Sequence, residues 1–320
     1  MSDLKYITKI AILYYREGLT HEQIARRLGI SRQTVGRYVE RSRKEGLVDI
    51  QIKSPLLFAT ELETSLEKRF NLREVVVVSP EFAGEDTVKD ALGIAGAEFL
   101  QRHISSGDNL GIAWGSTVLA VGRQLKTVNC ENVTIVQLNG SMDVGRYSTR
   151  AEFMVDLFAE AFGAQMVTLS APMLVDRPEI SESLLSDSRI AAALAIARKT
   201  NIALFGVGDV SESSSPFKVG YYDQNLLERV QRDGAVGEIC GRFYDNHGRP
   251  CSPEIDQRTL AIELENLKQK DLSIAVSGSP FKVEAILGAL QGKYCNVLIT
   301  DEETAKALLS RSEDLPEITG

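Results

Sequence analysis

The stretch "GISRQTVGRYVERSRKEGL", residues 29–47, places five basic side chains against two acidic ones in a chain of 320 residues whose net charge is −8. The imbalance extends over residues 1–53, which carry eleven Lys or Arg and six Asp or Glu, a net charge of +5. Residues 54–320 carry a net charge of −13. A small basic segment joined to a larger acidic one indicates that only the first meets a polyanion.

The residues before this stretch show the pattern of two short helices. Apolar residues share one face over residues 6–17, which predicts the first helix. Thr20 is suited to cap a second helix, with Gln23 as its capping-box partner three residues later. Gly29 closes that helix, because a residue just past a helix end often needs a positive φ.

The quoted stretch itself predicts a third, basic helix. Ser31 caps it and Gly46 ends it. The residues expected to face inward are Val35, Tyr38 or Val39, and Ser42. The following "VDIQI", residues 48–52, alternates as a short strand does.

Two helices joined by a tight glycine-containing turn, the second of them basic, describe a helix-turn-helix. The first turns of the second helix reach base edges in this motif, and here they expose Arg32, Gln33 and Arg37. Arg can bind guanine and Gln can bind adenine, whereas Gly36 gives up a side chain on the same face. The expected DNA-contacting residues are Thr20, Gln23, Ser31, Arg32, Gln33, Thr34, Arg37 and Arg41. The alternative is a solvated basic face on an ordinary three-helix bundle.

The length predicts two domains at ~150 residues each. We expect a helix-turn-helix domain at residues 1–53, a linking helix at 54–72 and an effector domain at 73–320. The linking helix carries an apolar stripe made of Leu57, Leu62, Leu66 and Phe70. A rigid, self-associating spacer suits a homodimer or homotetramer that binds two half-sites.

Composition excludes several other classes of protein. No window holds the ~18 apolar residues of a membrane span, and no apolar signal core opens the chain, so we expect a cytoplasmic protein without a membrane partner. The four cysteines are scattered, which is typical of reduced thiols, and the three histidines do not pair at ligand spacing, so we expect no metal. No P-loop is present and no G-x-G-x-x-G follows a strand, so we expect no cofactor.

Apolar strands alternate with helices from residue 74 onward. The expected strands are 75–79, 110–114, 133–138, 201–208, 272–278 and 296–300. The expected helices are 86–104, 117–126, 149–162 and one after each of the last two strands. Continuous apolar strands separated by helices predict a parallel sheet covered on both faces, a doubly wound α/β fold. Ligands of such sheets bind outside the carboxyl ends of the strands.

Small and polar residues follow four of these strands. They are Gly115, Ser116 and Thr117; Asn139, Gly140 and Ser141; Asp209; and Ser277, Gly278, Ser279 and Lys282. Such loops before a helix offer free backbone N–H groups and hydroxyls to a phosphate, and Lys282 adds a charged donor. Each loop alone is also an ordinary turn composition. Asp245, in "GEICGRFYDNHGRPCS" (237–252), is suited either to accept sugar hydroxyls or to occupy a hairpin turn.

Four motifs span nearly the whole chain: "YYREGLTHEQIARRLGISRQTVGRYVERSRKEGLV", "GDNLGIAWGSTV", "AVGEICGRFYDNHGRPC" and "FKVEAILGALQGKYCNVLITDEETAKALL". Together they resemble the SorC family of bacterial sugar-responsive transcriptional regulators, and most of all its Gram-positive deoxyribonucleoside regulators. The resemblance implies a Rossmann-like effector domain similar to phosphosugar isomerases, phosphorylated sugars as effectors, and dimers or tetramers on operator DNA. By motif, the residues it assigns to phosphate or sugar hydroxyls are Gly115, Ser116, Thr117, Asp245 and Lys282. Ser277 and Asn139 depart from the family's commoner residues beside the pocket.

We therefore predict a DNA-binding regulator and not an enzyme, a repressor of a carbohydrate or nucleoside catabolic operon, controlled by a phosphorylated sugar or polyol. The expected effector-binding residues are Gly115, Ser116, Thr117, Asn139, Gly140, Ser141, Asp245, Gly278, Ser279 and Lys282. The expected partners are operator DNA with two-fold symmetric half-sites, the effector and further copies of the chain. One alternative is a sugar-phosphate isomerase or deaminase with an appended DNA-binding module, with Asp245, Asp209 or His247 as its base. The other is a regulator whose effector domain binds a protein.

Overall fold

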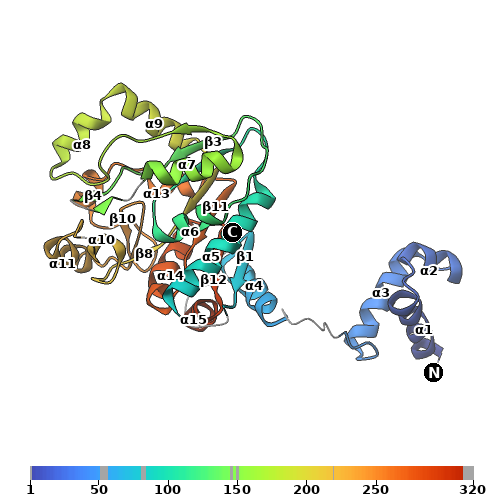
Figure 1. Cartoon of the computed structure of the whole chain (residues 1–320). Coiled ribbons are helices and arrows are strands. Elements are labelled where there is room, and N and C mark those ends of the chain that lie inside the picture. Colours follow the sequence, from blue (N-terminus) through green and yellow to red (C-terminus); the bar gives the residue numbers. More distant parts are fainter. Residues whose placement is uncertain are drawn as a thin grey trace. The chain divides into compact units, whose positions relative to one another are not determined.

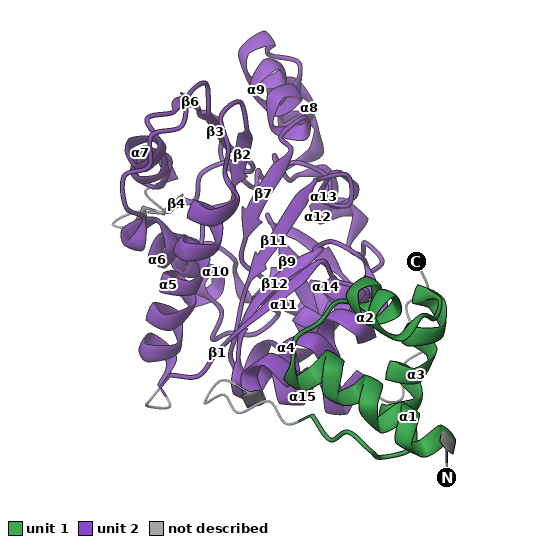
Figure 2. Cartoon of the chain, turned by 90° about the vertical axis from the view of Figure 1, so that its right-hand side faces the viewer, with its two compact units in different colours: residues 1–57 green, residues 58–320 purple. Residues whose placement is uncertain are grey.

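The computed structural model describes residues 2–50, 57–80, 84–144, 147–148, 151–218 and 220–312. The chain forms two compact units, Met1–Leu57 and Phe58–Gly320, which are coloured separately in Figure 2. We call them the first and the second unit. The helix that we expected as a separate linker belongs with the second unit from Phe58 onward.

The first unit is a three-helix bundle, as its periodicity predicts. Helix α1 (Ser2–Ala11) continues into a π-helical turn η1 (Ile12–Arg16), and α2 (His21–Leu28) and α3 (Arg32–Lys44) follow. The core consists of Ile10, Leu13, Ile24, Ala25, Val35 and Val39. Ser42 is buried as predicted, and Val39 rather than Tyr38 fills the inner position.

Local sequence signals set the ends of α2 and α3. The Thr20 hydroxyl accepts a hydrogen bond from the backbone N–H of Gln23 at 3.3 Å, and the Gln23 side chain accepts one from the Thr20 N–H at 2.8 Å. Gly29 has a left-handed φ of 67°, and Ser31 caps α3 through the N–H of Thr34. The expected strand is wrong at residues 48–50, which are irregular, while residues 51–52 lie outside the described part of the chain.

The second unit is built on a seven-stranded sheet in which every pair of neighbours is parallel. The strands are β1 (Glu74–Val78), β2 (Asn109–Ile112), β3 (Thr134–Gln137), β6 (Gln165–Val167), β7 (Ile202–Phe205), β11 (Leu272–Val276) and β12 (Val297–Asp301). Their order is β1-β12-β11-β7-β2-β3-β6, which confirms the parallel α/β sheet. The sequence missed β6, a three-residue edge strand that is mostly exposed and lacks an apolar run.

Helices cover both faces of this sheet, as a doubly wound fold requires. On one face α5 (Glu85–His103), α6 (Ser116–Gln124) and α7 (Ala151–Phe162) pack on one apolar cluster. On the other face α4 (Leu57–Phe70), α9 (Ser188–Arg198), α13 (Leu264–Leu267), α14 (Val283–Gln291) and α15 (Glu302–Ser312) contribute to a second cluster. Figure 2 shows α5, α6 and α7 on one side of the strands and α13 and α14 on the other. In β1, Val75 and Val77 belong to one cluster while Val76 and Val78 pack against the other.

Helix α4 faces the protein's own sheet. Leu62, Leu66 and Phe70 are buried in the cluster on that face, whereas the side chain of Leu57 lies outside the described part. The Glu63 and Glu67 carboxylates accept hydrogen bonds from the backbone N–H groups of edge strand β1, at Val77 (2.9 Å) and Val75 (3.0 Å). An edge strand is usually covered in some such way. The stripe therefore does not support an oligomer interface, and self-association stays a prediction.

Smaller elements surround the carboxyl edge of the sheet (Figure 1). An antiparallel sheet is formed by β8 (Gly208–Asp209), β9 (Gly237–Ile239) and β10 (Arg242–Tyr244), and a two-stranded ribbon by β4 (Asp143–Val144) and β5 (Tyr147–Ser148). The remaining helices are α8 (Pro178–Leu185), α10 (Ser215–Lys218), α11 (Gln224–Arg232), α12 (Pro253–Gln257) and η2 (Pro280–Lys282). No helix in the described part combines the length and apolar character needed to cross a bilayer.

Candidate DNA-binding and effector-binding sites

Five of the ten Lys and Arg side chains in residues 2–50 have hydrogen-bond or ion-pair partners within the first unit. Arg41 pairs with Asp3 (3.0 Å) and Glu45 (2.8 Å), and Lys44 pairs with Glu40 at 2.8 Å. Two further ion pairs join Arg26 to Glu22 and Arg27 to Glu17, and Arg43 donates a hydrogen bond to the Tyr15 hydroxyl. These contacts lie at the surface of the bundle and reduce the charge that it offers to a ligand.

Arg32, Gln33 and Arg37 are different. All three are exposed on the first two turns of α3, and within the described residues none of them has a hydrogen bond or ion pair. The Arg37 guanidinium lies over the Tyr38 ring, 5.9 Å from the ring centroid. The beginning of α3 thus presents two unpaired guanidinium groups and an amide, which suits base recognition.

The other residues that we expected to contact DNA cap helices or form ion pairs within the bundle. Thr20 and Gln23 cap α2, and Ser31 caps α3 while its hydroxyl lies 2.8 Å from that of Thr34. Arg41 is engaged by two carboxylates. Whether these residues also touch DNA stays a prediction.

Gly36 lies opposite His21 of α2. A Cβ added at Gly36 would lie 3.7 Å from the His21 ring, an ordinary contact, so helix packing does not demand glycine there. The His21 ring itself packs on Tyr14, with ring centroids 5.0 Å apart. Packing against His21 therefore does not explain why this position is a glycine.

The second unit has a cavity of about 670 Å³ at the carboxyl edge of the sheet. That size lies within the ~300–1,000 Å³ typical of small-molecule pockets. Residues that follow β1, β2, β7, β11 and β12 line it, together with the start of α5. Among the expected effector-binding residues, those that meet in this cavity are Gly115, Ser116, Thr117, Gly278, Ser279 and Lys282.

One wall of the cavity is the beginning of α6. Gly115 is the N-cap and has no side chain with which to cap the first turn. Ser116 is exposed and Thr117 is buried, so a ligand can reach the first hydroxyl directly. Uncapped N–H groups and the positive end of the helix dipole favour an anion at such a position.

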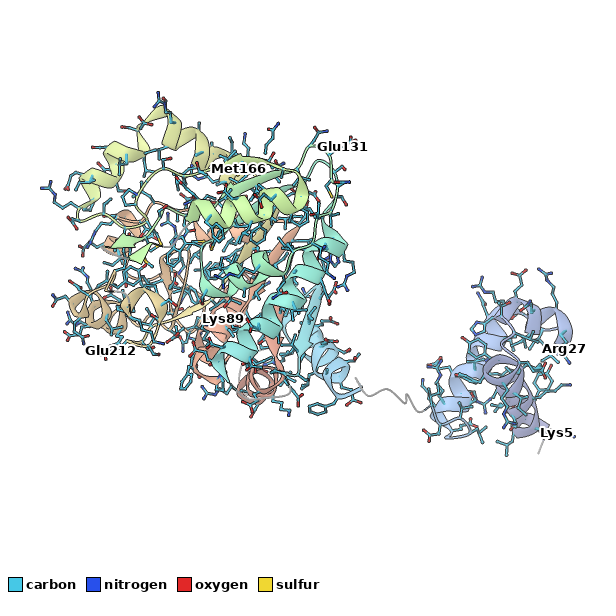
Figure 3. All side chains as sticks on the ribbon, viewed as in Figure 1. Lys5, Arg27, Lys89, Glu131, Met166 and Glu212 are labelled. Carbon is cyan, nitrogen blue, oxygen red and sulfur yellow. The ribbon has the colours of Figure 1, made fainter. Side chains whose placement is uncertain are left out.

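Lys282 forms another wall. Its side chain is partly buried, and its ammonium group has no hydrogen bond or ion pair among the described residues. Burial lowers the pKa of Lys282, and the negative charges of Asp209 and Glu238 oppose that shift. Lys89, from the first turns of α5 and labelled in Figure 3, also lines the cavity. An unpaired lysine beside uncapped N–H groups is well suited to a phosphate.

The loop before Lys282 is held in an unusual backbone conformation. Ser279 has a φ of 115°, and its N–H donates to Asp301 Oδ2 (2.9 Å) and to Thr304 Oγ1 (2.8 Å). A Cβ at Gly278 would collide with the Asp301 carboxylate. Asp301, which the sequence did not single out, therefore positions this loop from the end of β12.

Asn139, Gly140 and Ser141 lie outside the cavity. The Asn139 side chain accepts a long hydrogen bond from the Trp114 N–H (3.4 Å), and the Gly140 carbonyl accepts one from the Trp114 indole at 3.0 Å. Ser141 lines a separate, more open hollow of about 540 Å³. Asn139 and Gly140 thus position Trp114 by hydrogen bonds, and Trp114 in turn lines the main cavity.

Asp245 also lies outside the cavity. Its Oδ1 accepts the N–H groups of His247 and Arg249, each at 2.9 Å, and its Oδ2 accepts the Arg249 side chain. Burial alone would raise the pKa of Asp245, but the hydrogen bonds from Arg249 and His247 outweigh it and lower the pKa. This is the hairpin-turn alternative, in which the turn satisfies the carboxylate.

Glu238 is a cavity residue that the sequence analysis missed. It enters because β9 pairs with the two-residue strand β8, which sets Gly208 opposite Glu238. A strand of two residues has no periodicity to detect, so nothing in the sequence linked Glu238 to Asp209. Within the described residues, no group of three or more His, Cys, Asp or Glu could hold a metal ion.

Comparisons with known proteins agree with this arrangement. Residues 54–310 match the sugar-binding domain family, and residues 5–50 match the homeodomain-like domain family. The deoxyribonucleoside regulator of Bacillus subtilis (strain 168) is 35% identical over 303 residues, which cover 94% of this chain and 96% of that protein. The sorbitol operon regulator of Klebsiella pneumoniae is 31% identical over 310 residues, 96% of this chain and 98% of that protein.

Solved structures give the same result. The crystal structure of the full-length sorbitol operon regulator SorC from Klebsiella pneumoniae matches with a TM-score of 0.74 and 30% identity, over 97% of this chain and 100% of that one. These relatives are transcriptional regulators and not enzymes. The chain belongs to the SorC family of transcriptional regulators, in which a helix-turn-helix DNA-binding unit is joined to a sugar-binding unit.

Proposed function

We propose that this regulator binds operator DNA through the start of α3 and releases or rearranges on it when a phosphorylated sugar or polyol enters the cavity of the second unit. The observation that carries the proposal is Lys282, a half-buried lysine without a partner among the described residues, which lines the same cavity as the uncapped start of α6. The phosphate lies against Ser116, Thr117 and Lys282, where N–H groups, hydroxyls and one ammonium converge.

The charge of the second unit does not prevent this. Residues 54–320 carry a net charge of −13, which repels anions at long range. Repulsion between exposed charges is screened beyond ~8 Å at physiological salt, whereas the donors in the cavity act at contact distance. Local donors therefore decide whether the phosphate binds.

The protein acts in the cytoplasm as a homodimer or homotetramer on two-fold symmetric half-sites, and it represses a carbohydrate or nucleoside catabolic operon. Support comes from the relatives, which are named for deoxyribonucleosides and for a sorbitol operon. Two-fold operators suit closed homo-oligomers, because each copy offers one reading helix. Light scattering at micromolar concentration tests the assembly, and a monomer both with and without DNA would contradict it.

The functional test uses Lys282→Ala. Operator DNA affinity is measured by fluorescence anisotropy with and without a panel of sugar phosphates, and binding to the protein by the shift in melting temperature. A ligand at 100 times its Kd stabilises the folded protein by ~2.7 kcal/mol. We expect the variant to lose both the melting shift and the effector response, while its effector-free DNA binding stays nearly unchanged.

The matched control is Lys199→Ala, which removes the same charge from the exposed C-cap of α9. It should keep the full response. If Lys282→Ala retains the ligand-induced melting shift, or loses DNA binding without ligand, the proposed pocket is wrong.

A further inference from the structure

The cavity has two carboxylates on the side of Lys282 that faces β8 and β9. Asp209 ends β8 and Glu238 lies in β9, and both line the cavity together with Lys282. Both carboxylates raise the pKa of Lys282, against the lowering that burial causes. Lys282 therefore shares the cavity with two carboxylates whose charges favour its ammonium form.

Each carboxylate keeps acceptor capacity for a ligand. Glu238 Oε2 accepts the Gly241 N–H at 2.7 Å, while Oε1 has no hydrogen bond among the described residues and lies close over Gly208. A Cβ at Gly208 would collide with Oε1, so glycine is what lets this carboxylate reach the cavity. Asp209 Oδ2 accepts the Ser211 hydroxyl, and Oδ1 has no hydrogen bond in the described part.

We infer that the ligand of this cavity is a sugar or polyol with a single phosphate, and that Asp209 and Glu238 accept hydrogen bonds from its hydroxyl groups at the end remote from the phosphate. The inference rests on the proposed function of the same site and narrows its ligand class. Burial raises the pKa of Glu238, but the hydrogen bond from the Gly241 N–H and the charge of Lys282 oppose that shift and favour its ionised form. An ionised carboxylate only accepts hydrogen bonds, so the pair suits hydroxyl donors and opposes a second anion. A bisphosphate would bring its second phosphate against this pair, where repulsion in a half-buried cavity is strong.

The first arm of the test compares ligands by isothermal titration calorimetry. Glucose 6-phosphate, ribose 5-phosphate and sorbitol 6-phosphate serve as monophosphates, and fructose 1,6-bisphosphate and ribulose 1,5-bisphosphate as bisphosphates. We expect at least one monophosphate to bind at least 10-fold more tightly than either bisphosphate. A bisphosphate that binds as tightly as the best monophosphate overturns the inference.

The second arm uses the isosteric variants Asp209→Asn and Glu238→Gln, with melting temperature as the check on folding. Each variant should bind the best monophosphate at least 10-fold more weakly than the wild type does. The difference in affinity between this monophosphate and the bisphosphates should therefore become smaller. The melting shift produced by inorganic phosphate, which has no hydroxyl end, should not fall. The control is Glu212→Gln, an exposed glutamate labelled in Figure 3 that does not line the cavity, and it should change none of these values.

The outcomes separate the two proposals. If monophosphates bind and Lys282→Ala abolishes their binding, but both carboxylate variants bind them as the wild type does, the carboxylate assignment fails and the proposed function stands. If no phosphorylated ligand in the panel binds the wild type, both fail. If the unphosphorylated sugars bind as tightly as their monophosphates, the phosphate assignment fails.

Discussion

At the scale of single residues, partners decide what each cation of the first unit can do. Arg37 has no ion pair within the described residues, whereas Lys44, two turns further along α3, is paired with Glu40. An exposed pair of this kind contributes only ~0–1 kcal/mol, so Lys44 remains able to meet a phosphate. Arg37 is free to form the bidentate contact with guanine that discriminates between bases.

Arg37→Ala should therefore cost ~1–3 kcal/mol of binding free energy on the operator and relax the preference at one base pair. Lys44→Ala is the control and should weaken binding to all sequences alike. The measurement is fluorescence anisotropy on the operator, on its single-base variants and on random DNA. An equal loss on operator and random DNA for Arg37→Ala would reject its assignment to a base.

Lys270 predicts a pH dependence of stability. It is buried, its ammonium group donates to the carbonyls of Arg198 (2.7 Å) and Ala197 (3.3 Å), and burial lowers its pKa to about 8. Between pH 8 and the unfolded pKa near ~10.4, the unfolded chain binds more protons than the folded one, so the free energy of unfolding rises with pH. Below pH 8 both states are protonated and this contribution is constant.

The measurement is urea unfolding of the wild type and of Lys270→Met at pH 7.5 and pH 10. The free energy of unfolding of the wild type, minus that of the variant, should increase by about 1–3 kcal/mol over this range, at ~1.36 kcal/mol for each unit of pKa difference. Tyrosine and cysteine titrations occur in both proteins and cancel in the difference. A difference that is flat or falls with pH would show that Lys270 keeps an ordinary pKa.

At the scale of elements, α3 has a stabilising N-cap and a residue of low helix propensity in its interior. Ser31 caps it, but Gly36 interrupts it, and glycine costs ~1 kcal/mol relative to alanine inside a helix. The His21 ring leaves room for a methyl group at that position. Glycine in a reading helix also permits a close approach of the helix backbone to DNA.

Gly36→Ala should accordingly raise the free energy of unfolding of the first unit by ~0.5–1 kcal/mol and at the same time weaken operator binding. Calorimetric melting and anisotropy measure the two effects. A variant that gains stability with unchanged DNA affinity would mean that α3 does not approach DNA at Gly36. A lower free energy of unfolding would show that an alanine side chain does not fit beside the His21 ring.

At the scale of the whole molecule, a unit of net charge +5 over residues 1–53 is joined to one of −13 over residues 54–320. DNA and effector are bound on different units, so control of one by the other is a coupling free energy between two sites. An effector changes DNA affinity only by as much as it prefers one state of the protein over another.

Such coupling is reciprocal. If the effector lowers operator affinity by a given factor, operator DNA should lower effector affinity by the same factor, typically 5–150-fold. The effector Kd is measured by calorimetry with and without the operator duplex, and a random duplex is the control. Effector affinity that operator DNA leaves unchanged, beside a clear effect of effector on DNA binding, would mean that this effect is not an equilibrium coupling between the two sites.

The sequence by itself determined what depends on neighbours a few residues apart. The caps at Thr20 and Ser31 and the left-handed Gly29 are local hydrogen-bond and backbone preferences, and the parallel sheet follows from apolar runs separated by helices. The start of α6 at Gly115 is local in the same way, because glycine followed by two hydroxyl residues is a common turn before a helix.

Only the tertiary structure decided which of these loops meet. Lys282 joins Asp209 and Glu238 because β11 pairs with β7 and β8 pairs with β9, and strand order is set by packing between residues far apart in the chain. Asp245 does not line the cavity, and the N–H groups of its own turn donate to its carboxylate. Composition alone could not show whether this carboxylate would be bonded within the turn or free to bind a ligand. The sequence showed that α4 carries an apolar stripe, but only the fold showed that this stripe packs on the sheet of its own chain. The hydrophobic effect favours burial of an apolar surface without specifying which surface covers it.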